Sequence, residues 1–109
     1  MSRFEQVAQE VAENSYLREW YDKVMSIIGD YPPAYLTEDR IIETVANKMI
    51  VRNEGDIPNE EDRIFFTKIL WVILERIKGN YEFLPCAEKK LQQKLHAKQV
   101  SLLIKKAKD

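Results

Sequence analysis

Cys86 and His96 are the only cysteine and the only histidine in this chain, and they are its first candidates for nucleophilic catalysis. Both fall in the segment predicted to form the last helix, where their spacing separates them by about 15 Å along the axis and about 280° around it. A cysteine–histidine dyad is therefore excluded if both lie on that helix. Lys89, Lys90 and a predicted helix N-terminus near Cys86 favour a thiolate, so thiol chemistry stays open beside a packing role.

The same two residues are too few for metal binding. A structural zinc site takes four Cys or His ligands, and no Glu-x-x-His pair is present for a carboxylate-bridged centre. Three well-separated glycines exclude the glycine-rich nucleotide-binding loops and the nucleophile elbow. We therefore expect no bound metal, no cofactor and no enzymatic activity.

Lysines are the most informative charged residues. Residues 1–62 carry six Lys or Arg against fourteen Asp or Glu, a net charge of −8, whereas residues 63–109 carry eleven against four, a net of +7. At 100° per residue, one side of the predicted last helix, about residues 85–107, gathers a basic stripe. The acidic half of the same chain could neutralise this stripe across the bundle or between subunits. The predicted partner- or phosphate-binding lysines are Lys90, Lys94, Lys98 and Lys105.

The predicted last helix also has two apolar sides. One side is predicted to seat the helix on the bundle, and it comprises Leu84, Ala87, Leu91, Leu95 and Leu102. A second set, roughly opposite, is the predicted partner-binding apolar face: Val100, Leu103 and Ile104. Such a face could lie in the groove of a partner, including a second copy of the chain, or the end of the helix could fold back over the core. The sequence leaves both outcomes open.

Hydrophobic periodicity and capping residues predict four further helices. The first spans about residues 3–14, and the second starts at Asn14 or Ser15 and ends at Gly29, although the two could be one bent helix. Two consecutive prolines then predict a turn at residues 29–33. Thr37 caps a third helix to about residue 50, and Asn59 caps a fourth at about residues 59–78.

The predicted helix at about residues 59–78 is the most apolar segment of the chain, with hydrophobic residues around most of its circumference. Helices of this kind lie at the centre of a bundle. The fold class expected is therefore all-α, as an irregular four- to five-helix bundle around this helix. With 109 residues and no linker-like segment, residues 1–109 are expected to form a single helical domain.

The composition of the chain predicts where in the cell the protein is found. A charged fraction of 32% and the lack of a long uninterrupted apolar run argue against a membrane span. The chain begins with an amphipathic, charged pattern rather than the apolar core of a signal peptide, and a single cysteine fits a reducing compartment. We expect a cytoplasmic protein with no membrane contact.

These observations together predict a small non-enzymatic interaction or regulatory module. A protein partner is favoured, and a homodimer is compatible with the same surface. The alternative is binding to the backbone of RNA or DNA, without sequence specificity, through the lysines of the last helix. The low sequence pI of about 5.9 argues against nucleic-acid contact, and the lack of arginine in the basic stripe argues against base-specific recognition.

Overall fold

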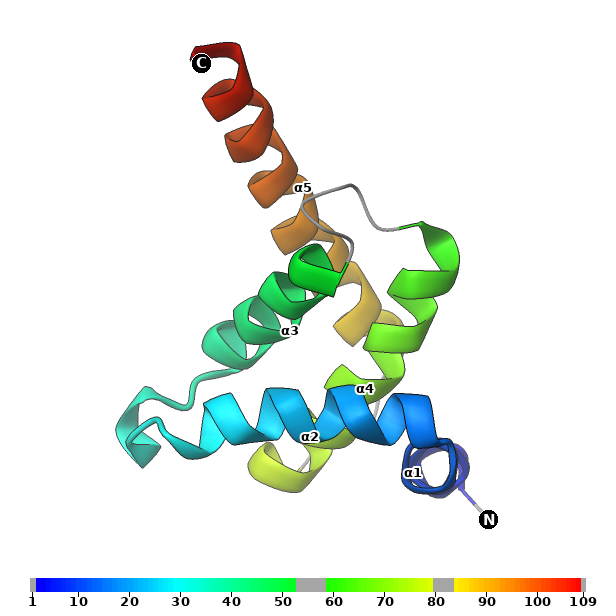
Figure 1. The fold of residues 1–109 in the computed structure, drawn as a ribbon. Coiled ribbons are helices and arrows are strands. Elements are labelled where there is room, and N and C mark those ends of the chain that lie inside the picture. The colour runs from blue at the N-terminus through cyan, green and yellow to red at the C-terminus, as the bar shows by residue number, and fades with distance from the viewer. Residues whose placement is uncertain (1, 53–58, 80–83, 109) are drawn as a thin grey trace.

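The computed structural model describes residues 2–52, 59–79 and 84–108. These residues form an all-α bundle, which confirms the predicted fold class (Figure 1). No helix within them is long and apolar enough to cross a membrane. The elements, in chain order, are α1 Arg3–Glu13, α2 Ser15–Gly29, the short 3-10 helix η1 Pro33–Tyr35, α3 Glu38–Arg52, α4 Glu60–Lys78 and α5 Leu84–Lys108.

Helices begin and end at the polar and glycine residues that the sequence marks. The Oδ1 atom of Asn14 accepts a hydrogen bond of 3.0 Å from the backbone N–H of Tyr16, so α1 and α2 are two helices rather than one bent helix. The side chains of Thr37 and Asn59 likewise accept backbone N–H groups in the first turns of α3 and α4. Helix α4 ends at Gly79, whose φ of +79° lies in the left-handed region that glycine adopts without strain.

Helix α4 packs against each of the other four α-helices. Residues 69–74 are all buried, so this part of the helix has no face in solvent. Two of its aromatic rings make edge-to-face contacts with neighbouring helices, with ring centroids 5.7 Å apart for Phe66 and Trp20 and 5.8 Å apart for Trp71 and Phe4. The predicted position of this helix at the centre of the bundle is confirmed.

The buried side chains that the structure describes on α5 all lie in the N-terminal half of the helix. Ala87, Leu91 and Leu95 are buried where α5 packs on α3 and α4, as the sequence predicts, while the side chains of Leu84 and Leu102 lie outside the described part of the structure. Figure 1 shows the red end of α5 extending past all other helices, and the molecule measures 50 × 32 × 23 Å. Residues 100–108, called here the α5 tip, continue the helix for about 13 Å.

Two isoleucines of α4 provide a matched test of this packing. Ile69 is fully buried, whereas Ile64, one and a half turns earlier, is 46% exposed. We expect Ile69→Ala to lower the free energy of unfolding by about 2–5 kcal/mol, because it removes buried contacts and leaves a cavity. Ile64→Ala should lower it by less than about 1 kcal/mol. Urea unfolding followed by circular dichroism measures both, and equal losses would contradict the central position of α4.

Candidate functional site

The predicted basic stripe runs along α3 and is partly neutralised by it. The Nζ atom of Lys90 pairs with Glu38, and the Nζ atom of Lys98 lies 3.3 Å from Oε1 of Glu43. Lys94 lies between them on the same side of α5 and is half-buried. Two of the four predicted binding lysines thus have carboxylate partners inside the bundle, so the neutralisation that the sequence left open takes place within one chain.

The pair between Lys98 and Glu43 can be tested by charge reversal. We expect Lys98→Glu to lower the free energy of unfolding by less than about 1 kcal/mol, because it replaces a solvent-screened attraction by a repulsion. The double variant Glu43→Lys/Lys98→Glu should recover most of that loss, and high salt should reduce the difference. Thermal unfolding at two salt concentrations measures it. A double variant no more stable than Lys98→Glu alone would show that the two charges do not interact.

The predicted apolar face lies on the α5 tip and is open to solvent. Val100, Leu103 and Ile104 are 43%, 61% and 52% exposed, and Lys105 on the next side of the helix is exposed too. The tip does not fold back over the core, which was one of the two outcomes that the sequence allowed. These three aliphatic side chains form an apolar surface that no described residue of the chain covers.

Two further aliphatic residues, Val51 and Ile64, are also exposed, by 64% and 46%. The sequence places Ile64 in the predicted central helix at about residues 59–78, and it does not mark Val51 as a site residue. Ile64 comes in the second turn of α4, before that helix is enclosed. Its position next to the acidic first turn is a sequence signal that could have separated it from the core.

All of these residues belong to one end of the bundle, where α3 ends, α4 begins and α5 leaves. Arg52, next to Val51, pairs with Asp62 at the start of α4, and Arg63 lines a hollow with Gln99 of α5. We call Val51, Ile64, Val100, Leu103 and Ile104 the exposed aliphatic set.

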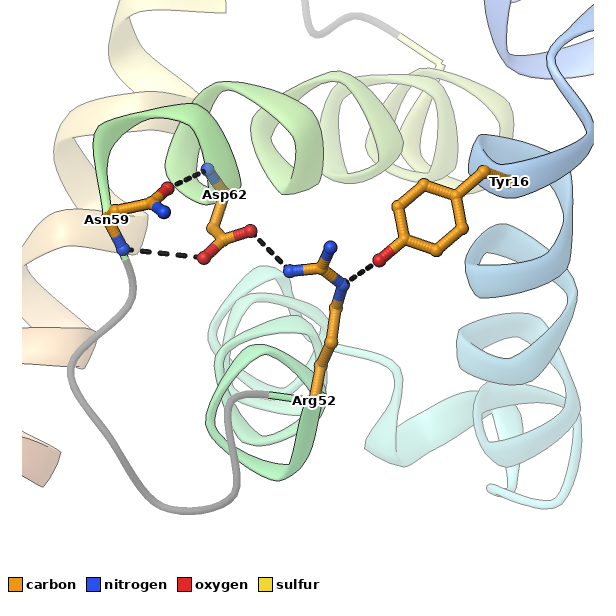
Figure 2. A network of polar contacts seen from close by, with 4 residues as sticks. All are labelled: Tyr16, Arg52, Asn59 and Asp62. Carbon is orange, nitrogen blue, oxygen red and sulfur yellow. Dashed lines mark hydrogen bonds and ion pairs between the residues drawn. The ribbon is translucent and has the colours of Figure 1, made fainter.

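A polar network holds this end of the bundle together (Figure 2). The guanidinium of Arg52 donates one hydrogen bond to the phenol oxygen of Tyr16 on α2 and another to the carboxylate of Asp62 on α4. Asp62 and Asn59 form a capping box, in which Asn59 Oδ1 accepts from the Asp62 backbone N–H at 2.8 Å and Asp62 Oδ2 accepts from the Asn59 backbone N–H at 3.4 Å. One arginine therefore connects three helices.

Electrostatics within the network keep Arg52 charged. Burial lowers the pKa of its guanidinium, but the hydrogen bond to Tyr16 and the charge and hydrogen bond of Asp62 raise it by more, so the pKa lies above its ordinary value. The rings of Tyr16 and Phe65 lie beside the same guanidinium, 4.9 and 5.7 Å from its central carbon. The network holds the end of α3 beside the start of α4, where Val51 and Ile64 are its neighbours in the sequence.

Removing Asp62 should loosen this end of the bundle. We expect Asp62→Ala to lower the free energy of unfolding by about 1–3 kcal/mol, because it removes the cap of α4 and leaves the half-buried Arg52 without its carboxylate. Tyr16→Phe, which removes one hydrogen bond, should lower it by less than about 1.5 kcal/mol. Chemical unfolding of the two variants checks this order, and an unaffected Asp62→Ala variant would contradict it.

Two hollows on the surface carry cationic side chains. One, of about 230 Å³, lies between α4 and α5 and is lined by Arg63, Leu95, His96 and glutamines. The buried Nε atom of Arg63 has no hydrogen-bond partner among the described residues. The other, of about 290 Å³, lies between α1, α2 and α4, where Arg76 donates a hydrogen bond of 2.7 Å to the phenol oxygen of Tyr21. Both hollows offer hydrogen-bond donors, and neither brings a nucleophile next to a base.

Cys86 and His96 do not come together. Both lie on α5, at the spacing that excludes a dyad, and Cys86 is exposed rather than packed in the core. In the described ranges, no group of three or more His, Cys, Asp or Glu side chains could hold a metal ion. Thiol chemistry at Cys86 stays a prediction without a supporting neighbour in the part of the chain that the structure describes.

Comparison of the chain with protein-family models, with curated protein sequences and with solved structures finds no match. The site is therefore interpreted from its own contacts, burial and charge. These draw attention to the α5 tip and the end of the bundle from which it projects, because that is where exposed aliphatic side chains gather.

Proposed function

We propose that this chain is a small, non-enzymatic interaction or regulatory module that docks a protein partner through the apolar face of the α5 tip. One observation carries the proposal: Val100, Leu103 and Ile104 are exposed on a helix that extends beyond the bundle. An exposed apolar face of this kind is typical of helices that insert into a groove of another protein, with anchors at i, i+3 and i+4.

The spacing of the three residues supports a helix-in-groove contact. Val100, Leu103 and Ile104 follow one another at i, i+3 and i+4, so they share one side of α5. Between Lys89 and Lys108 the helix contains no acidic residue. The expected partner surface is therefore an apolar groove with carboxylates at its rim, because these would match the lysines around the tip.

Contact with the backbone of RNA or DNA is the alternative proposal. It requires lysines that are free to meet phosphates, and Lys90 and Lys98 are already paired with carboxylates of α3. Breaking these pairs would offset part of the gain from phosphate contacts. The exposed aliphatic side chains of the tip would gain little from a phosphate backbone, so a protein partner is favoured.

Photo-crosslinking in the producing cells tests the proposal. A photoreactive phenylalanine analogue placed at Leu103, which is 61% exposed, should form a discrete crosslinked product that resists nuclease and is destroyed by protease. The same analogue at Tyr35, which is 53% exposed on η1, is the matched control and should give no such product, because η1 lies far from the α5 tip in Figure 1.

The possible products separate the two proposals. A product from Leu103 that is removed by nuclease would replace the protein partner by a nucleic acid, and Lys94→Glu/Lys98→Glu should then abolish it. Equal products from Leu103 and Tyr35, or none from either, would contradict docking through the α5 tip.

A further inference from the structure

The bundle end from which α5 projects carries a second surface that is complementary to the α5 tip. Ile64 is 46% exposed, and Glu60 and Glu61 precede it by four and three residues on α4. These spacings place both carboxylates next to Ile64 on one side of the helix. Glu60 and Glu61 are exposed and form no ion pair with any described residue. This acceptor surface has an apolar centre and an acidic border.

The α5 tip also has an apolar centre, but its border has the opposite charge. Its apolar centre, Val100, Leu103 and Ile104, is bordered by Lys106 on one side and Lys105 on the other, at 100° per residue. Both lysines are exposed, and neither pairs with a carboxylate in the part of the chain that the structure describes. The tip is therefore an apolar centre with a basic border.

Within one chain the two surfaces do not meet. Leu103 on the tip and Ile64 on α4 both stay largely exposed, and Figure 1 shows the tip pointing away from the start of α4. Because α5 is anchored by Ala87, Leu91 and Leu95, a straight helix cannot bring its end back to α4. Contact between the two surfaces requires a second molecule.

We infer that the partner is a second copy of this chain, with the α5 tip of each copy seated on the Ile64 surface of the other. This inference rests on the proposed function. Two such contacts related by a two-fold axis form a closed dimer, in which every tip and every acceptor is used once.

The charges of the two surfaces favour this geometry over a dimer in which the two α5 tips contact each other. Two tips side by side would bring Lys105 and Lys106 of each copy close to the same lysines of the other, with no acidic residue on the tip to compensate. Tip on acceptor instead places these lysines beside Glu60 and Glu61. Residues 1–62 carry a net charge of −8 and residues 63–109 a net charge of +7. These opposite charges add a longer-range attraction that favours the same contact.

Sedimentation equilibrium of the purified chain over a wide concentration range tests the inference. The wild type should show a reversible dimer of twice the 12.9 kDa chain mass. Leu103→Asp and Ile64→Asp should each weaken dimerisation by 10-fold or more, since each places a charge in an apolar contact (roughly 1.4 kcal/mol per factor of ten). Tyr35→Asp, a matched change at another exposed hydrophobic residue, should leave the dissociation constant unchanged.

Charge reversal identifies which surfaces meet. Glu60→Lys/Glu61→Lys and Lys105→Glu/Lys106→Glu should each weaken the dimer about 10-fold, and the combined quadruple variant should regain most of the lost affinity. Circular dichroism checks that each variant keeps its helices. A wild type that stays monomeric at all concentrations would overturn the inference, as would a dimer in which the quadruple variant is no stronger than either double variant.

The crosslink from Leu103 separates this inference from the proposed function. A product of twice the chain mass supports the second copy as partner. A heavier, protease-sensitive product together with a monomeric purified chain would overturn the self-association while leaving docking of a protein on the α5 tip intact.

Discussion

Helix α4 is enclosed by all four other α-helices, and the burial of its middle turns organises the bundle. Residues 69–74 have no solvent face, so every neighbouring helix must supply an apolar side to cover them. This requirement explains how apolar and charged residues are distributed on the other helices. Helices α1, α2, α3 and the first half of α5 each present buried aliphatic residues toward the centre and charged residues outward. The enclosure also sets a limit, because the 19-residue α4 covers only part of the 25-residue α5.

The α5 tip is a consequence of this mismatch in length. Among the side chains that the structure describes, the buried ones of α5 extend to Leu95, and the ion pair from Lys98 to Glu43 joins the next turn of the helix to α3. Beyond it, Val100, Leu103 and Ile104 stay exposed, and no described part of the chain covers them. Apolar side chains on a protruding helix are unfavourable for an isolated molecule, and a partner would remove them from water. The same residues that make the tip unfavourable alone make it suitable for association.

The network of Arg52, Asp62 and Tyr16 makes this end of the bundle rigid. It holds the end of α3, the start of α4 and the start of α2 in one arrangement through charge-assisted hydrogen bonds. Ile64 and its flanking carboxylates therefore lie on a fixed surface. A rigid acceptor and a regular helix as donor lose little conformational freedom on association, which favours binding by small surfaces.

Local signals in the sequence determined most of the secondary structure and the class of the fold. Asn14, Asn59 and Gly79 mark the ends of helices, because capping depends on a few neighbouring backbone groups. The apolar run of α4 predicted its burial, because it left the helix without a polar face. The lysine stripe was also visible, but the sequence could not decide whether it was free. Its neutralisation depends on Glu38 and Glu43, which are some fifty residues distant in the chain and come close only when α5 packs on α3. The exposure of Ile64 and Val51, and the projection of the α5 tip past its neighbours, were likewise decided by tertiary structure, because they depend on where the other helices end.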